Sequence, residues 1–272
     1  MEAFLEFFET MPTWQKLAWI FACLSINWIA EAGAPLKHLR YKKWRHAATN
    51  LVFLSCSVLV SFLFGLATLW VFDWVAANDI GLLYMIDLPV IVELIIAVAI
   101  LDFFAQYFLH YLLHKVKWMW KFHMIHHSDT EVDATTGTRH HPGDYLLREV
   151  FALVSVVFLG IPLAFFLFYK ILTVFFAYFT HANITIPAKL DQALSWVIIT
   201  PNMHKFHHHF ERPWTDTNFG NIFSIWDRIF GTLVYDDPHK VKYGLDVLDD
   251  SRSADLGYQF KVPFDQSIET DY

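Results

Sequence analysis

Hydrophobic and polar positions along the chain form four long apolar runs, at residues 17–30, 50–77, 88–114 and 149–180. A helix that crosses a bilayer needs roughly 20 apolar residues. The second and third runs are long enough, and the first becomes so with its flanking aromatic residues. Residues from 183 onward are mixed and polar, which predicts a cap on the cytosolic side. The pattern therefore predicts an all-α integral membrane bundle, with about four transmembrane or re-entrant segments under a helical cap.

The fourth run contains a break, because Gly160, Ile161 and Pro162 interrupt it and proline cannot continue a helix undisturbed. Its 32 residues would make about 48 Å of helix, which is short for two full crossings of a ~30 Å core. A re-entrant or tilted helical hairpin and a single span both stay open. The hairpin is favoured, since a single span would put His181 on the opposite side from His140 and His141.

Basic residues are concentrated in one loop. Five of the twenty Lys and Arg residues lie within 36–45, and none lies between His46 and His114. The positive-inside rule keeps this loop in the cytoplasm, and the third run then returns to the cytoplasm at the basic, Trp-rich stretch 114–121. The N-terminus is expected outside, and its acidic first ten residues are not typical of a cleavable signal peptide.

Composition agrees with this class. The chain of 272 residues is 56% hydrophobic and only 17% charged, whereas soluble domains are about a quarter charged. A formal charge of −7 with no basic groove excludes nucleic acid as a partner. Both cysteines, Cys23 and Cys56, lie in apolar runs and predict no disulfide framework. The length predicts a single domain over 1–272, in which 236–272 form a cytosolic tail.

Candidate chemistry lies in the histidines, most of which are clustered. One pair has the spacing H-x-x-x-H, two triplets have the spacing H-x-x-H-H, and one further histidine follows the fourth run. The nine candidate metal ligands are His110, His114, His123, His126, His127, His181, His204, His207 and His208.

Helix geometry explains why these spacings suit metals. Positions i, i+3 and i+4 lie on one face, while adjacent positions diverge by about 100°, so each triplet suits two metals better than one. Nine imidazoles exceed the needs of one zinc and suit two metals with four or five ligands each; iron, zinc and copper all accept imidazole. His38, His46 and His239 are expected to be structural, His209 a neighbour, and His140 and His141 stay open.

The order and spacing of these clusters, with 138–149 (TRHHPGDYLLRE), 179–184 (FTHANI) and 218–232 (NFGNIFSIWDRIFGT), resemble the fatty acid hydroxylase superfamily, or sterol desaturase family. The resemblance covers about residues 95–235. It implies a membrane enzyme in which the nine histidines hold two non-haem iron ions and O2 oxidises a lipid C–H bond. The family's R-x-H-P falls on Arg139, His141 and Pro142, which implies that His141 lies near the site. Ala177 stands where some fatty acid 2-hydroxylases carry an extra histidine, a departure from that subgroup.

Polar residues near the clusters are expected to support the ligands. Metal-bound imidazoles usually donate their other N–H to a carboxylate or carbonyl. Asp102 lies inside the third run, where a carboxylate is costly without a partner or a function. Asp102, Asp227 and Asn183 are the candidates for this supporting role.

The sequence thus predicts a hydroxylase of a bacterial inner membrane or an endoplasmic reticulum, with its site on the cytosolic side. Its substrate is a lipid from the bilayer. An external electron-transfer protein is expected, because neither G-x-G-x-x-G nor G-x-x-x-x-G-K occurs. Three alternatives stay open: a lipid desaturase with the same site, a metal transporter, and a zinc-dependent lipid hydrolase. Transport sites lie near the bilayer midplane, and nine nitrogen ligands leave little room for a hydrolase's open site.

Overall fold

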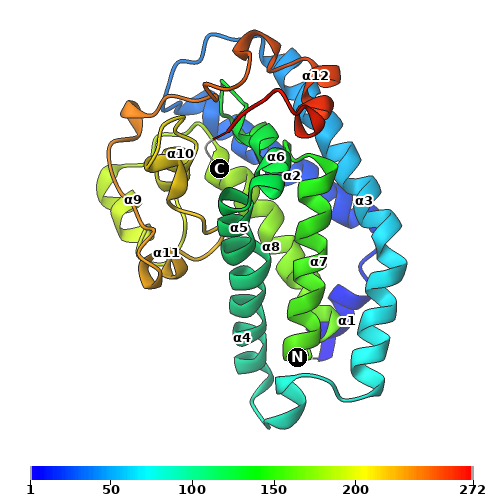
Figure 1. Ribbon diagram of the computed structural model, residues 1–272. Coiled ribbons are helices and arrows are strands. Elements are labelled where there is room, and N and C mark those ends of the chain that lie inside the picture. The colour runs from blue at the N-terminus through cyan, green and yellow to red at the C-terminus, as the bar shows by residue number, and fades with distance from the viewer. Residues whose placement is uncertain (1, 271–272) are drawn as a thin grey trace.

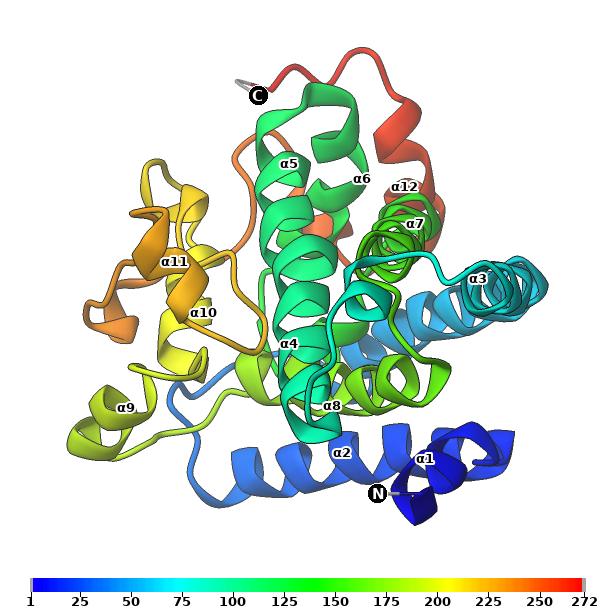
Figure 2. The same ribbon diagram turned by 90° about the horizontal axis from the view of Figure 1, so that it is seen from below.

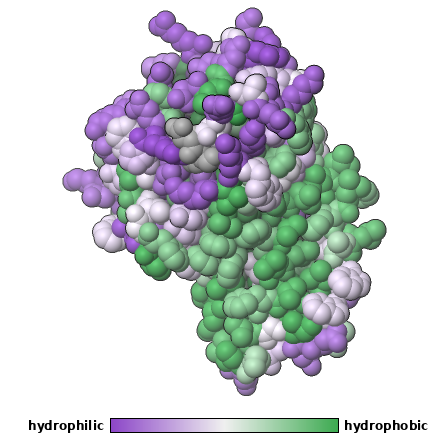
Figure 3. All heavy atoms as spheres, in the orientation of Figure 1, coloured by the Kyte–Doolittle hydropathy of each residue, from purple (hydrophilic) through white to green (hydrophobic). Residues whose placement is uncertain are grey.

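The structure, a computed structural model, describes residues 2–270. Within this range it contains helices, turns and two isolated β-bridges, Pro35–Ile184 and Ile198–Phe223, so the all-α prediction is confirmed. Long helices form the lower part of the molecule and short helices form a cap above them (Figure 1). The surface of the long helices is largely apolar and that of the cap largely polar (Figure 3). This division is the one that a membrane protein with an aqueous cap requires.

The long helices follow the apolar runs. They are α2 (Thr13–Gly33), α3 (Lys43–Ala77), α4 (Val90–Asp102) with its continuation through the π-helix η2 (Phe103–Phe108) into α5 (Leu109–Lys115), α7 (Pro142–Leu159) and α8 (Leu163–His181). Three segments of the described residues are long and apolar enough to cross a bilayer: Lys43–Met85, Val90–Lys115 and Leu163–His181. Helix α2, expected from the first run, is not one of these three, and it runs across the other long helices (Figure 2).

The short elements make up the rest. They are α1 (Glu2–Glu9), η1 (Leu82–Met85), α6 (Lys117–His127), η3 (Ala134–Thr138), α9 (Ala188–Leu194), α10 (Pro201–His207), η4 (Trp214–Asp216), α11 (Ile225–Ile229), η5 (Pro238–Lys240), η6 (Asp250–Arg252), α12 (Leu256–Lys261) and η7 (Val262–Phe264). Helix α1 packs against α8 at the end away from the cap, where the rings of Phe4 and Phe8 each lie 5.3 Å from that of Phe168.

The fourth run forms the predicted hairpin. Helix α7 ends at Gly160, whose φ of 77° is left-handed and favours glycine. A Cβ there would also come within 2.6 Å of the Ile80 carbonyl oxygen. Pro162 then precedes α8, which returns to the cap and brings His181 Nε2 to 3.0 Å from His126 Nε2. The single-span alternative is wrong, because it would separate these two residues by the thickness of the membrane.

The core of the bundle lies between α4, α7 and α8. Its buried side chains include Leu101, Val156, Phe165 and Tyr169, and the Tyr169 hydroxyl donates to the Leu101 carbonyl at 3.2 Å. Lipid tails are as apolar as leucine, so helices in a bilayer associate through close packing and hydrogen bonds rather than through removal of apolar surface from water. This packing fixes the cap ends of α5 and α8, which carry three of the nine candidate histidines, His110, His114 and His181.

Candidate metal centre

Four helix ends, those of α5, α6, α8 and α10, bring all nine candidate histidines together where the bundle meets the cap. The structure separates them into two groups, within each of which the possible ligand atoms lie within 4.8 Å of one another. The five-histidine group contains His110, His114, His123, His127 and His207, and the four-histidine group contains His126, His181, His204 and His208. All nine are buried.

Local sequence explains this division. At Val116 (φ −109°, ψ 111°) the chain turns from α5 into α6, so that the two helices face each other. Adjacent histidines diverge as predicted: His127 joins the five-histidine group while His126 points into the other. At the end of α10, His207 and the residue that follows the helix, His208, separate in the same way. Thr200 begins this helix, because its hydroxyl accepts from the Met203 N–H and Pro201 occupies the first helical position.

Hydrogen bonds to the outer ring nitrogens orient the five-histidine group. His110 Nδ1 donates to the Phe219 carbonyl at 2.8 Å, and His207 Nδ1 donates to the Thr217 carbonyl at 2.7 Å. His123 Nδ1 donates to the Asp144 carboxylate at 2.9 Å. His114 Nδ1 lies 3.4 Å from the Asp216 carboxylate. Since carbonyls only accept, the Nδ1 of His110 and of His207 carries the proton, and the Nε2 lone pair of each ring is left free.

In the four-histidine group, His181 occupies the central place. Its Nδ1 donates to the Ala177 carbonyl at 2.6 Å, which leaves a lone pair on Nε2. That Nε2 lies 3.0 Å from Nε2 of His126 and 3.0 Å from Nε2 of His204. No sequence pattern marks the carbonyls of Ala177, Thr217 and Phe219 as partners, because every residue has a carbonyl.

The donor set fits bound metal ions. His110 Nε2 and His123 Nε2 are 2.9 Å apart, and both rings carry their proton on the other nitrogen. Two lone pairs at this distance repel unless a cation lies between them. Imidazole nitrogens that bind one metal ion, each at about 2.0–2.1 Å, would come closer to each other than two free lone pairs can. In addition, His207 Nε2 and both ring nitrogens of His208 are buried without a hydrogen-bond partner among the described residues.

Electrostatics favour the neutral imidazoles that metals require. Burial, with added repulsion from neighbouring rings, lowers the pKa well below its ordinary value in His126, His127, His204, His207 and His208. Burial also lowers the pKa of His123 to about 3, although the Asp144 carboxylate opposes it. In water near neutral pH these rings are therefore uncharged and able to coordinate.

Asp144 is a further carboxylate beside the ligands, and it was not among the residues predicted from the sequence. Burial by itself would raise its pKa, but the Arg148 guanidinium and the imidazoles of His123 and His140 hold that pKa well below its usual range. Arg148 Nε donates to Asp144 at 3.0 Å and His140 Nδ1 lies 2.9 Å from it. The His140 ring stacks on that of His126, with centroids 4.5 Å apart. The signal was the i, i+4 spacing of His140 and Asp144 in the TRHHPGD stretch.

Asp102 and Asp227 make different contacts from the expected ones. Asp102 accepts from the backbone N–H groups of Ile222 (3.2 Å) and Phe223 (3.1 Å) and from Trp226 Nε1 (3.0 Å). Asp227 accepts from the Phe219 N–H (2.8 Å), from the Gly220 N–H (2.9 Å) and from the Thr232 hydroxyl. Both carboxylates therefore hold the loop before α11, and Asp227 reaches the ligands only through the Phe219 carbonyl.

Asn183 and His141 also bind neighbouring backbone rather than the imidazoles. The Asn183 amide accepts from the Lys37 N–H and donates to the Lys37 carbonyl. His141 caps α7 by accepting from the Gly143 N–H at 3.1 Å. His38, His46, His209 and His239 lie in neither group. His46 instead pairs with the buried Asp129 at 2.8 Å.

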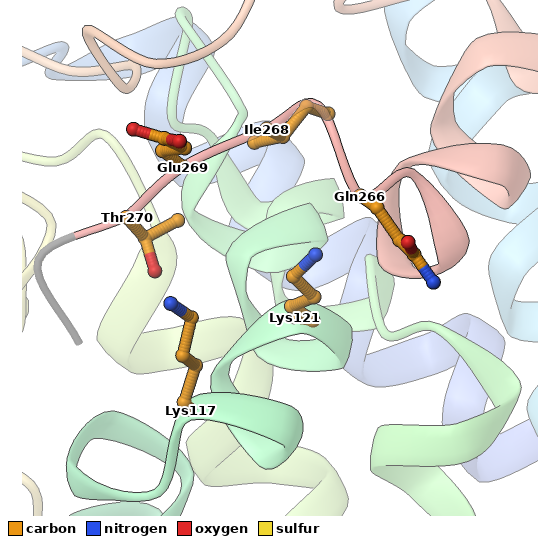
Figure 4. A pocket seen from close by; sticks show the side chains of 6 residues that line it. All are labelled: Lys117, Lys121, Gln266, Ile268, Glu269 and Thr270. Carbon is orange, nitrogen blue, oxygen red and sulfur yellow. The ribbon is translucent and has the colours of Figure 1, made fainter.

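A hollow outside the centre lies on the outer side of α6. The segment before the C-terminus passes over this helix, and Lys121 Nζ donates to the Asp265 carbonyl at 2.8 Å. Figure 4 shows the side chains that line it, which are Lys117, Lys121, Gln266, Ile268, Glu269 and Thr270. None of them is a grouped histidine, so this hollow is separate from the candidate metal centre.

Comparison with known proteins finds relatives that are named as lipid hydroxylases or monooxygenases. The chain is 29% identical over 145 residues to an ornithine lipid hydroxylase of Rhizobium tropici, an alignment that covers 53% of this chain and 43% of that protein. It is 28% identical over 142 residues to the alkylglycerol monooxygenase of Homo sapiens, covering 52% and 31%. It is 27% identical over 158 residues to a cholesterol 25-hydroxylase-like protein of Danio rerio, covering 56% and 61%.

The chain thus spans less than two thirds of the length of each of these relatives. No solved structure matches it. The family defined as fatty acid hydroxylase matches residues 94–232, slightly more than half of the chain, and this segment contains all nine grouped histidines. The chain belongs to the fatty acid hydroxylase family.

Proposed function

We propose that this protein is a membrane-bound oxygenase that uses two non-haem iron ions and O2 to hydroxylate a C–H bond of a lipid. The observation that carries the proposal is the convergence of nine buried imidazoles into two adjacent groups, in which Nε2 atoms of different rings face each other at 2.9–3.2 Å. Three relatives are named as a hydroxylase of ornithine lipid, a monooxygenase of alkylglycerol and a cholesterol 25-hydroxylase-like protein. Lipid C–H bonds are the substrate class that these names share.

The iron ions would be held by His110, His114, His123, His127 and His207 in one group and by His126, His181, His204 and His208 in the other. When bound, they would supply the redox chemistry that couples O2 to C–H oxidation. The chain itself fixes the tautomers through Asp144 and the carbonyls of Phe219, Thr217 and Ala177. It also excludes bulk water, because all nine rings are buried. Such exclusion protects a reactive centre from side reactions.

Position in the membrane follows from the same geometry. The centre lies at the cap ends of α5 and α8, where the candidate spans Val90–Lys115 and Leu163–His181 end. The basic loop 36–45 lies close by, since the Lys37 N–H binds Asn183, two residues after α8. By the positive-inside rule the cap end would be cytosolic. Electrons would come from a separate redox protein, because this chain carries no dinucleotide-binding motif.

The test is a lipid analysis of membranes with and without the protein under isotopically heavy O2. The proposal expects lipids that gain one heavy oxygen atom, only when iron and an electron donor are supplied. Products that lose two hydrogen atoms and gain no oxygen would instead identify a desaturase. Turnover without O2 would overturn the oxygenase and favour hydrolysis. A variant with the exposed His239 replaced by Ala is the matched control, because His239 lies outside both groups.

A further inference from the structure

The cap carries an apolar surface that its polar composition does not predict. We call this surface the cap patch. It consists of Trp196, Val197, Ile225, Ile229 and Phe230, whose side chains are 43% to 65% exposed. Two segments of chain build it side by side, since the Ser224 N–H donates to the Val197 carbonyl and Arg228 Nη2 donates to the Ser195 carbonyl. Large apolar patches on an aqueous surface mark contact with another phase or partner.

Contacts with the candidate span Val90–Lys115 fix the position of the cap patch along the direction that crosses the membrane. Helix α11 lies at the lower edge of the cap, beside α4 and α5 (Figures 1 and 2). The Phe230 ring lies 5.6 Å from that of Phe103 and 5.3 Å from that of Tyr107, both in the π-helix of the span. Asp102, one residue earlier, accepts the Trp226 N–H. The patch is therefore fixed to the middle of this helix and not to its cap end.

The length of the span gives the depth of this attachment in the bilayer. The span Val90–Lys115 has 26 residues, which is about 39 Å at about 1.5 Å per residue, longer than a ~30 Å core. Asp102 then lies about 18 Å from one end and about 20 Å from the other. With Val90 at the far edge of the core, Asp102 lies about 12 Å inside the edge nearer the cap, and Phe103 and Tyr107 lie closer to that edge. The segment 222–226, whose N–H groups bind Asp102, must reach the same depth. These N–H groups explain why a carboxylate can lie inside a membrane helix.

The side chains of the patch are those of a membrane interface. Tryptophan and arginine are enriched at this level, with the aliphatic part of arginine in the apolar layer. Here the Arg228 guanidinium lies 4.0 Å from the centre of the Trp196 ring. Figure 3 shows apolar residues at the lower edge of the cap, beside the apolar surface of the long helices.

We propose that the cap patch is inserted in the cytosolic leaflet of the bilayer, so that lipid tails, and not water or a protein, cover Trp196, Val197, Ile225, Ile229 and Phe230. The cap is then partly a membrane-embedded element. Lipid covers the cap patch because the patch is continuous with the candidate span Val90–Lys115, through Phe103, Tyr107 and Asp102.

The insertion also gives a lipid substrate a short way to the metal centre, a consequence that rests on the proposed function. The exposed Phe230 ring contacts that of Tyr107, which lies 6.2 Å from that of Phe219. Phe219 in turn lies 5.6 Å from His110 and 5.6 Å from His207. A continuous row of aromatic rings therefore connects the cap patch with the five-histidine group. Displacement of these rings would admit an acyl chain.

The experiment measures depth directly and needs no substrate. Single cysteines, Val197→Cys and Ile229→Cys, are placed in a full chain whose native Cys23 and Cys56 are replaced by alanine, and they are labelled with a nitroxide in phospholipid nanodiscs. Spin-relaxation measurements compare the collision rates with O2, which concentrates in the bilayer, and with a water-soluble nickel chelate. The control is Ser251→Cys, at the exposed 3₁₀ turn of η6 on the polar part of the cap.

We expect the ratio of O2 to chelate collisions to be about tenfold higher at positions 197 and 229 than at 251, as for side chains in the apolar interface. A ratio equal to that at 251 at either position would overturn the proposal. Metal content equal to that of the unlabelled protein verifies that each variant is folded. Insertion without any oxidised lipid would contradict the proposed function and leave the cap patch in place.

Discussion

The five-histidine and four-histidine groups lie next to each other, yet the protein holds them differently. In the first group His110, His123 and His207 each donate an outer N–H to a carbonyl or carboxylate. In the second group His181 does so. The Nδ1 atoms of His126, His204 and His208 have no hydrogen-bond partner among residues 2–270.

This difference implies a division of roles. A hydrogen bond to the outer nitrogen fixes the tautomer and ring orientation and makes the ligand more basic. The five-histidine group is therefore the better preformed and should bind its metal more tightly. The four-histidine group has one ligand fewer and more freedom in its rings, which suits a metal that keeps a position open for reaction.

Removing one ligand from each group should abolish activity. His207→Ala and His126→Ala each delete an imidazole that faces the other rings of its group, and we expect each variant to lose about one metal ion per chain. Both proteins should still insert in the membrane, because the histidines lie at helix ends and not on lipid-facing surface. Metal analysis and lipid turnover are measured beside His239→Ala. Full metal occupancy in both variants would count against the assignment of the ligands.

Weakening a single outer hydrogen bond should affect one group more than the other. Asp144→Asn removes the charge that His123 faces, and supporting residues of this kind are worth about 10–100-fold in metal affinity. The loss should occur at the five-histidine group, measured by competition with a chelator of known affinity. Asp250→Asn, at the surface turn η6, is the matched control. Equal weakening of both metals by Asp144→Asn would remove the distinction between the groups.

How far the sequence predicts this arrangement depends on the kind of contact. The spacing of His123, His126 and His127 predicts which rings converge and which diverge, since helix periodicity alone decides it. The break at Gly160 and Pro162, with histidines at both ends of the run, likewise predicts the hairpin. The histidine spacing is a local feature of one helix. The hairpin follows from the requirement that histidines at both ends of the run belong to one site.

Contacts through the backbone were not predictable in the same way. The Phe219 carbonyl binds His110 because the loop before α11 folds back onto the span, and no local pattern encodes that path. Asp102 was expected to support an imidazole, and it was unusual enough to be singled out. Its partners are instead two backbone N–H groups and the Trp226 indole N–H, all 120 residues or more away in sequence. The polarity of the chain after residue 183 also concealed the cap patch, whose apolar side chains become contiguous only when two segments pair.

Adding a ligand should reduce the difference between the groups. Ala177 lies one helical turn before His181 on α8, so Ala177→His would place a fifth imidazole on the same face. We expect the metal of the four-histidine group to dissociate about tenfold more slowly in this variant, in line with the gain from one well-placed contact. Stopped-flow transfer to a chromogenic chelator measures it. If metal release from the four-histidine group were no slower than in the wild type, or were faster, the added ring would disturb His181 instead of binding the metal.

The smallest effect is expected from Asp227→Asn, which acts on the five-histidine group at a distance. Asp227 holds the N–H groups of Phe219 and Gly220, and the Phe219 carbonyl orients His110. An amide can replace one carboxylate oxygen but presents a donor to the second N–H, so the loop should shift and metal affinity should fall about three- to tenfold. Burial raises the pKa of Asp227 to about 6, so below that pH the wild-type carboxyl is itself protonated and equally neutral. Chelator competition should therefore show a gap between wild type and variant that is full above about pH 7 and closes below about pH 5. A gap of constant size across this range would mean that shape, and not the charge of Asp227, holds the loop.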